Sequence, residues 1–499
     1  MNGQESRLLS VPILASSALW SLTAQALPAL VGVVTIPFIV QGLGVERFGV
    51  LTLAWMVIGY FGLLDLGLGR AVTKLAAEFL VSAERPHFDR LVWTAWYLML
   101  GLGLAGALVL ATIAPWLVRT AVKIPPEIQP ETLQTFYLLA ASIPIVVLTT
   151  GFRGVLEAAQ HFRLTSLIKI PMGVLTFLTP LFVLRFSTNL AVIVLALIAV
   201  RLLGAIAYAV MCHRAVHIVP TPPSIDRNSA RALLGHGAWM TVSNVVSPLM
   251  MSVDRFFVGA FLSVAAVAYY ATPFEAVTKL LIIPSAVAAV LFPAFSTASV
   301  IDPGRMVKLF RMGLWAVFLS MYPIAFVVIT FAPELLRLWL GATFAAESTT
   351  ALRWLTVGVF MNSLAALPFA LLQGVGRSET TAKIHLLEAP IYLVLMIWLI
   401  RQFGITGAAI AWGARTTLDL LLLSWYARRD LRTPTSERLA DLTLFAALTP
   451  MLAAGLLFRS PLHRVLLTVI LIFPFALLVW RRAVAIGHGV IVREPERAG

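Results

Sequence analysis

The chain has 499 residues, of which 60% are hydrophobic and only 12% are charged. A soluble protein of this size carries about twice that share of charged residues, because its surface must face water. The composition therefore excludes a soluble protein and indicates a chain that lies mostly within lipid. The net charge of +14 fits Lys and Arg in cytoplasmic loops, which membrane topology requires, and it does not indicate nucleic acid. Cys212 is the only cysteine, which excludes a disulfide framework and a cysteine-based metal site.

Apolar stretches long enough to cross about 30 Å of hydrocarbon recur along the chain. They predict an all-α integral membrane protein of about 14 transmembrane helices. The predicted spans are 14–40, 48–69, 91–117, 134–156, 167–186, 190–212, 236–261, 265–292, 309–333, 351–374, 384–402, 405–427, 441–458 and 461–480. Ala24-Gln25-Ala26 resembles a signal-peptidase site. The apolar stretch continues to Val40, however, and so predicts an uncleaved first helix.

The basic residues predict the orientation of these spans. Loops on the side of the N-terminus hold roughly 24 Lys and Arg residues, against about nine in the opposite loops. We therefore expect a multi-pass protein of the inner (plasma) membrane with both termini in the cytoplasm. No loop exceeds about two dozen residues, which leaves no room for an extramembrane catalytic domain. The sequence thus indicates a protein that is not an enzyme.

The two halves of the chain resemble each other at a shift of roughly 216–219 residues. Residues 43–49 resemble 262–268, and residues 155–169 resemble 371–385. A repeat of six helices predicts two lobes around a central cavity that opens to alternate sides. The expected parts are an N-terminal lobe at 1–212, a cytoplasmic linker at 213–235, a second lobe at 236–427, and a C-terminal helix pair with a cytoplasmic tail at 428–499.

Ionisable residues inside spans are costly to insert and commonly face a cavity. Glu275 with Lys279, and Arg415 with Asp419, have the i, i+4 spacing of ion pairs. Each pair either lines a site or merely neutralises itself and locks helices together.

Two arginines lack such a partner in the sequence. Arg201 has no acidic residue in its own span, and Arg255 has only the adjacent Asp254, which points elsewhere on a helix. Guanidinium groups bind phosphate through paired donors, so unpaired arginines that face a wet cavity predict an anionic cargo.

The candidate site follows from these residues. The predicted substrate-binding residues are Arg201, Arg255, Lys279, Arg70, Arg153 and Arg415. Arg70 and Arg153 lie near the cytoplasmic ends of their spans, where they either receive the cargo first or act as ordinary anchors. The residues predicted to couple an ion or to pair with these cations are Asp65, Asp254, Glu275 and Asp419. The sequence holds no Walker motif and no set of metal ligands, so we expect no cofactor.

Two segments carry a resemblance to a known family. Residues 44–71 are similar to the opening signature of the polysaccharide transporter family, the Wzx-like flippases of the MOP superfamily. The similar elements are Gly44, Phe48-Gly49 and Asp65-Leu66-Gly67-Leu68-Gly69. A second similar region is 253–277, and helix order and loop lengths resemble the family over most of the chain.

This resemblance implies two six-helix lobes plus a terminal helix pair. It implies a flippase that moves an undecaprenyl-diphosphate-linked oligosaccharide from the cytoplasmic to the periplasmic leaflet for O-antigen, exopolysaccharide or capsule synthesis. Basic residues of the central cavity would bind the pyrophosphate, and Arg255 belongs to a similar segment. The implied partners are the lipid-linked glycan, membrane lipids, and a polysaccharide polymerase with other assembly proteins.

Other functions stay open at this point. A multidrug exporter of the same superfamily would require an acidic cavity, which Arg201 and Arg255 argue against. The spacing of the motifs does not distinguish a lipid II flippase from a flippase for lipid-linked oligosaccharides. A membrane glycan polymerase or ligase would need a larger loop, and a purely structural membrane protein is the remaining alternative.

Overall fold

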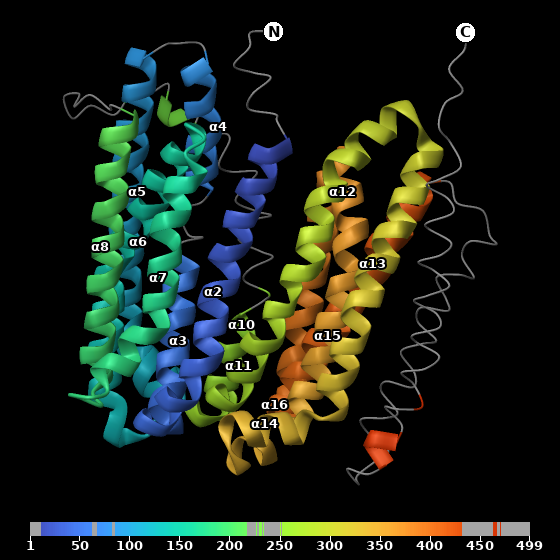
Figure 1. Cartoon of the computed structure of the whole chain (residues 1–499). Helices are drawn as coiled ribbons and strands as arrows, with labels where there is room; N and C mark the ends of the chain where they lie inside the picture. Colours follow the sequence, from blue (N-terminus) through green and yellow to red (C-terminus); the bar gives the residue numbers. More distant parts are fainter. Residues whose placement is uncertain are drawn as a thin grey trace, which may run out of the picture. The chain divides into compact units, whose positions relative to one another are not determined.

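The computed structural model describes residues 11–61, 67–81, 85–216, 226, 229–231, 233, 250, 252–431, 463–466 and 470. Within these residues the secondary structure is helical throughout, and nine helices are long and apolar enough to cross a membrane (Figure 1). The prediction of an all-α membrane protein is thereby confirmed. Lipid offers the backbone no hydrogen-bond partner, so these apolar runs form helices, which satisfy their own backbone.

The helices of the first half follow the apolar runs. They are α2 (Val11–Leu43), α3 (Val45–Phe61), α4 (Leu68–Val81), α5 (Arg85–Trp116), α6 (Gln129–Ala158), α7 (Phe162–Val183) and α8 (Leu190–Val216). A π-helical turn, Leu117–Ala121, and a 3-10 turn, Pro126–Ile128, connect α5 to α6. The helix α2 runs without a break through Ala24-Gln25-Ala26.

The second half contains two short helices among long ones. Its elements are α10 (Val253–Phe261), α11 (Val264–Thr278), the 3-10 turn Lys279–Leu281, α12 (Ile282–Ile301), α13 (Pro303–Thr330), α14 (Ala332–Leu340), α15 (Ala342–Gly374) and α16 (Ser378–Leu431). The Asp302 side chain accepts a hydrogen bond from the Arg305 amide (3.0 Å) and so caps α13, which has Pro303 at its first position.

The short turns of the sequence appear at the predicted places. The helix α7 ends at Val183 and α8 begins at Leu190, as the polar residues 185–189 predict. In α16 the backbone leaves the helical conformation at Gly404 (φ 58°, ψ −138°), between the predicted spans 384–402 and 405–427. A positive φ is readily adopted by glycine, which has no Cβ.

Other boundaries differ from the prediction. The span predicted at 48–69 does not run as one helix to its end, because Gly67, directly before α4, has a φ of 72°. Residues 62–66, between α3 and Gly67, lie outside the described residues. The sequence did not predict α14 as a separate helix. Many helices also extend past the predicted apolar stretches into flanking residues. The span 441–458, most of 236–261 and 461–480, and most of the linker 213–235 lie outside the described residues.

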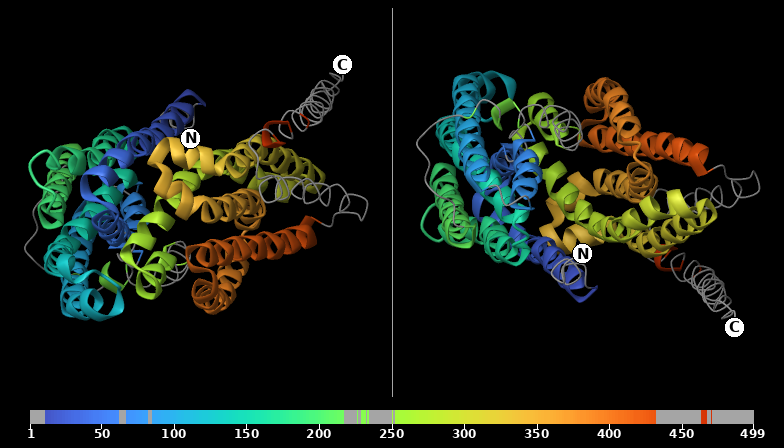
Figure 2. Two further views of the ribbon diagram at one scale, coloured as in Figure 1. Left: turned by 90° about the horizontal axis from the view of Figure 1, so that it is seen from below. Right: turned by 90° about the horizontal axis from the view of Figure 1, so that it is seen from above.

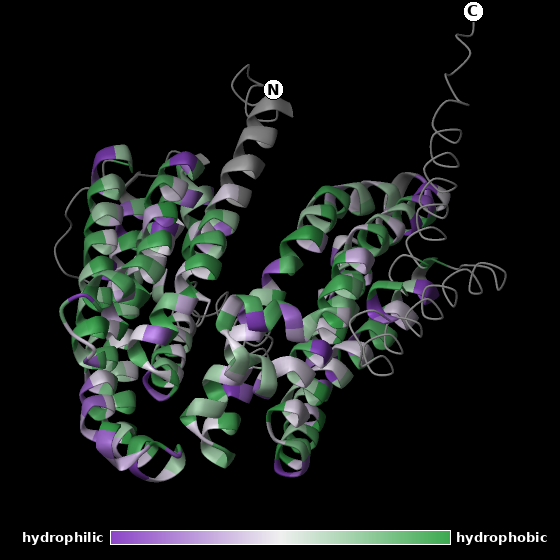
Figure 3. Ribbon diagram, turned by 60° about the horizontal axis from the view of Figure 1, so that its bottom comes forward, coloured by the Kyte–Doolittle hydropathy of each residue, from purple (hydrophilic) through white to green (hydrophobic). Residues whose placement is uncertain are grey.

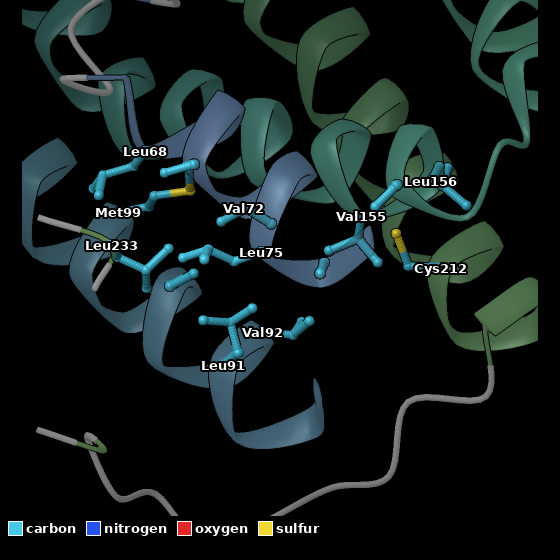
Figure 4. Packing of buried hydrophobic residues seen from close by; sticks show 14 of the residues in the cluster. Leu68, Val72, Leu75, Leu91, Val92, Met99, Val155, Leu156, Cys212 and Leu233 are labelled. Carbon is cyan, nitrogen blue, oxygen red and sulfur yellow. The ribbon is translucent and has the colours of Figure 1, made fainter. Parts of the chain in front are cut away.

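The chain divides into two compact units. Unit 1 comprises Met1–Ile282 and Ser378–Arg415, and unit 2 comprises Ile283–Arg377 and Thr416–Gly499. In unit 1, a core of buried residues from α4, α5, α6 and α8 includes Leu68, Val72, Met99, Val155 and Cys212 (Figure 4). Figure 2 shows the helices α2–α8 end-on as a bundle. In unit 2, the ring of Phe318 on α13 meets that of Phe360 on α15 edge to face, with centroids 5.8 Å apart.

Large apolar side chains also cover the outside of the helices. Leu30, Leu108, Leu203 and Val290 are each more than 60% exposed. Figure 3 shows hydrophobic residues along the long helices of each unit, with many of the hydrophilic ones near helix ends. Such a surface suits contact with lipid rather than with water.

Candidate functional site

Three of the predicted residues, Arg255, Glu275 and Lys279, meet where the start of α10 lies beside the end of α11. The Arg255 Nη2 atom lies 2.6 Å from Oε1 of Glu275, and the Lys279 Nζ atom lies 3.1 Å from Oε2 of the same carboxylate. The side chain of Arg255 is only 6% exposed, whereas those of Glu275 and Lys279 are 38% and 48% exposed. One carboxylate therefore binds a buried and a half-exposed cation at once.

The local fold explains this meeting. The helices α10 and α11 are joined by Leu262 and Ser263 alone, and the Ser263 side chain accepts a hydrogen bond from the Ala266 amide (3.0 Å) to cap α11. So short a connection turns the chain back, which places the start of α10 beside the end of α11. Arg255 and Glu275 lie at these two places.

Asp254 holds the same two helices together through a second contact. It is fully buried, and its Oδ2 atom accepts a hydrogen bond of 2.5 Å from the Tyr270 hydroxyl. Its Oδ1 atom accepts a hydrogen bond of 2.8 Å from the Arg255 amide. Burying a carboxylate is costly unless it is hydrogen-bonded, and these two donors meet that requirement.

An aromatic ring lies over the Arg255 guanidinium. Its Cζ atom lies 5.2 Å from the centroid of the Phe274 ring, an arrangement that is attractive for a cation over an aromatic face. Phe274 in turn stacks on Tyr270 (5.7 Å) and meets Trp412 of α16 edge to face (5.1 Å). Phe274 and Glu275 thus contact the guanidinium of a buried Arg255.

Arg415 of α16 adds a third cation in unit 1. It is buried, and its guanidinium lies 5.8 Å from the centroid of the Tyr392 ring. It is close enough to Asp254 for mutual electrostatic attraction. We refer to Asp254, Arg255, Glu275, Lys279 and Arg415 as the charged cluster. With two carboxylates and three cations, its formal charge is positive.

Other predicted residues lie apart from the charged cluster. In the described part of the chain Arg201 of α8 has no ion pair and is partly exposed. Arg153 pairs with Glu157 on its own helix at 3.5 Å. Arg70 is exposed in the first turn of α4.

The remaining carboxylates of the prediction have different outcomes. Asp419 of α16 is buried, and its pairing with Arg415 stays a prediction. Asp65 lies outside the described residues. The i, i+4 pair of Glu275 and Lys279 is present, as its spacing predicts.

One expectation from the sequence was wrong. Arg255 does have an acidic partner, namely Glu275, which lies on the next helix and outside the reach of an i, i+4 rule. Sequence reasoning also missed Tyr270, Tyr392 and Phe274, which complete the surroundings of the cluster. Apolar spans contain many aromatic residues, so no pattern marked these three.

Comparison with known proteins agrees with this architecture. A family model described as polysaccharide biosynthesis protein matches residues 43–349. The chain is 30% identical over 415 residues to a putative O-antigen transporter of Shigella flexneri, covering 83% of this chain and 97% of that protein.

Two solved structures share the fold. The lipid II flippase MurJ in an inward closed conformation has a TM-score of 0.70 at 13% identity, covering 94% of this chain and all of that one. An inward-facing multidrug resistance transporter of the MATE family of the MOP superfamily has a TM-score of 0.68 at 16% identity, covering 82% and 94%. From the match to the family model and to the Shigella relative, the chain belongs to the polysaccharide biosynthesis protein family.

Proposed function

We propose that this protein is a flippase that moves an undecaprenyl-diphosphate-linked oligosaccharide from the cytoplasmic to the periplasmic leaflet by alternating access. The likeness to a putative O-antigen transporter over 97% of that protein's length supports it. The fold shared with the lipid II flippase MurJ is compatible with such a cargo. The observation that carries the proposal is the positive charged cluster, in which Arg255 is held among apolar and aromatic residues.

The chemistry of the cluster suits a diphosphate. A diphosphate diester bears about two negative charges, and it offers several oxygens to the fork of a guanidinium group. Arg255 is fixed in place by Glu275 and Phe274, while Lys279 is half exposed beside it. Arg255, which is buried, and Lys279, which is half exposed, together provide the hydrogen-bond donors for a diphosphate.

The other residues of the prediction receive roles in this proposal. Arg201 and Arg415 bind the cargo along with Arg255 and Lys279. Arg70 and Arg153 receive it at the cytoplasmic side; their helices approach closely, since a Cβ on Gly154 would lie 2.8 Å from the carbonyl oxygen of Gly69. The carboxylates Asp65, Asp254, Glu275 and Asp419 pair with the cations or couple an ion.

The wider setting is part of the same proposal. The protein resides in the inner membrane with both termini in the cytoplasm, as the distribution of Lys and Arg indicates. Two six-helix lobes, 1–212 and 236–427, alternate around a central cavity, and a polysaccharide polymerase receives the product. Helix bounds that recur along the chain support the lobes: α3 begins at Val45 and α11 at Val264, while α7 begins at Phe162 and α16 at Ser378.

A deletion strain tests the function. Without the protein, lipid-linked oligosaccharide should accumulate on the cytoplasmic face of the membrane, and the wild-type gene should restore surface glycan. Arg255→Ala should abolish this restoration at an unchanged level of protein, because the diphosphate loses its buried donor. Arg305→Ala, at an exposed arginine of α13, is the matched control and should restore surface glycan fully. Full restoration by Arg255→Ala would remove Arg255 from the site.

The fold likeness brings in two alternative cargoes within the superfamily. A multidrug exporter would handle cationic drugs, which the positive charged cluster would repel; drug sensitivity of the deletion strain separates this case. A lipid II flippase would handle the same diphosphate chemistry. Rescue of a strain depleted of its lipid II flippase distinguishes that cargo from a polysaccharide repeat unit.

A further inference from the structure

Glu275 already occupies one donor atom on each of the two cations that a phosphate would use. Its Oε1 atom lies 2.6 Å from Arg255 Nη2, and its Oε2 atom lies 3.1 Å from Lys279 Nζ. Carboxylate and phosphate oxygens compete for the same charged donors. A diphosphate that binds through these same donor atoms must therefore displace the carboxylate from them.

From this geometry we propose that Glu275 is an internal competitor: it fills the diphosphate site of the empty carrier, keeps single-charge phosphodiester lipids out of it, and helps to release the cargo after translocation. This inference rests on the proposed flippase function. It assigns to Glu275 a role that pairing alone does not require.

The exposed fractions of the side chains indicate which partner in the Arg255–Glu275 ion pair can move. Glu275 is 38% exposed, so its carboxylate has room to turn away when a ligand displaces it. Arg255 is 6% exposed and lies against the Phe274 ring, so its guanidinium stays in place. The exchange is thus a movement of the carboxylate and not of the arginine.

The Glu275 carboxylate also stabilises the carrier when no cargo is bound. A buried arginine without a partner is destabilising, because its charge has lost its hydration. Glu275 compensates that charge until the cargo arrives, and it returns when the cargo leaves. It also lowers the affinity for every anion by the same factor, so phosphodiester headgroups with one charge stay mostly unbound. A diphosphate, which reaches Arg255 and Lys279 together, still binds.

Binding to the purified full-length protein in an uncharged detergent tests the inference. The probes are farnesyl diphosphate and, as a single-charge phosphodiester, dioctanoyl phosphatidylglycerol, each titrated by calorimetry. Glu275→Gln keeps the shape of the side chain and removes its charge. We expect the affinity for both probes to rise by roughly tenfold, which corresponds to about 1.4 kcal/mol. Phosphatidylglycerol should then compete with farnesyl diphosphate, and flipping in vesicles should slow because release is slower.

The chain offers a closely matched control. Glu379 pairs with Lys383 at i, i+4 (2.7 Å), with both side chains more than 70% exposed at the start of α16. Glu379→Gln makes the same chemical change outside the site and should leave both affinities unchanged. Glu275→Asp keeps the charge on a shorter side chain that reaches the two cations less well, so its affinities should lie between those of wild type and Glu275→Gln.

The outcomes separate the two proposals. Wild-type or weaker binding of farnesyl diphosphate by Glu275→Gln overturns the competitor role and leaves the flippase intact. If Glu275→Gln does not fold, Glu275→Asp is the deciding variant. Should Glu275→Asp bind farnesyl diphosphate no more tightly than wild type does, the competitor role is equally overturned. If wild-type protein binds no farnesyl diphosphate and Arg255→Ala behaves like wild type in cells, the diphosphate site itself is wrong.

Discussion

At the scale of single residues, buried polar groups of unit 1 find partners across helices. Asp254 is fully buried and depends on Tyr270 and on the Arg255 amide for its hydrogen bonds. Arg255 depends on Glu275 and Phe274. The contacts of Asp254 with Tyr270 and of Arg255 with Glu275 and Phe274 join α10 to α11, so the charged cluster stabilises the helix pair as well as preparing it for a ligand.

Tyr270→Phe tests the first of these contacts. It removes the hydroxyl donor and leaves a buried carboxylate oxygen without its hydrogen bond, which costs about 1–3 kcal/mol. We expect a lower melting temperature of the purified protein. Tyr137→Phe, which removes a hydroxyl from a 43% exposed tyrosine of α6, is the control and should melt like wild type. Equal melting of both variants would contradict the importance of the Asp254–Tyr270 bond.

At the scale of elements, α3 and α11 approach each other closely near their N-terminal ends. A Cβ on Gly49 would lie 1.9 Å from the carbonyl oxygen of Val264. The loop before α6 holds the end of α10, which directly precedes α11. The Lys123 amide donates to the Gly259 carbonyl (3.0 Å), and Lys123 Nζ donates to the Phe261 carbonyl (2.6 Å). Gly49 belongs to the segment that resembles the flippase family, and close approach is a physical reason for glycine there.

Gly49→Ala should therefore force these helices apart. Overpacking of this kind costs about 1–3 kcal/mol, which exceeds the gain of roughly 1 kcal/mol from the better helix former. We expect reduced thermal stability and lower yield of folded protein. Gly101→Ala in α5, where a Cβ would meet nothing within 4 Å, should be neutral or stabilising. A Gly49→Ala protein as stable as wild type would show that α3 and α11 separate without cost.

At the scale of the whole molecule, the proposed cargo carries charge across the membrane. Moving one charge across 100 mV is worth about 2.3 kcal/mol. Outward flipping of a diphosphate with about two charges would thus gain up to about 5 kcal/mol from a cytoplasm that is negative, if no ion compensates.

Reconstituted vesicles test this energy source. With the potential clamped at zero, we expect flipping of a lipid-linked oligosaccharide to slow markedly relative to an inside-negative potential. Vesicles without protein give the background rate. Rates that do not depend on the potential would dismiss this energy source and direct attention to ion coupling by Asp254 or Glu275.

The sequence by itself determined the membrane class, most helices and the local ion pair of Glu275 and Lys279. These depend on composition, on apolar length and on the 3.6-residue period of a helix, all of which are local. The turn at Gly404 was predictable for the same reason. Only the tertiary structure decided that Arg255 binds Glu275, that Asp254 meets Tyr270 and that Arg415 lies over Tyr392. These partners come from different turns or helices, and their meeting depends on how the chain reverses between α10 and α11 and how α16 packs, which no period in the sequence records.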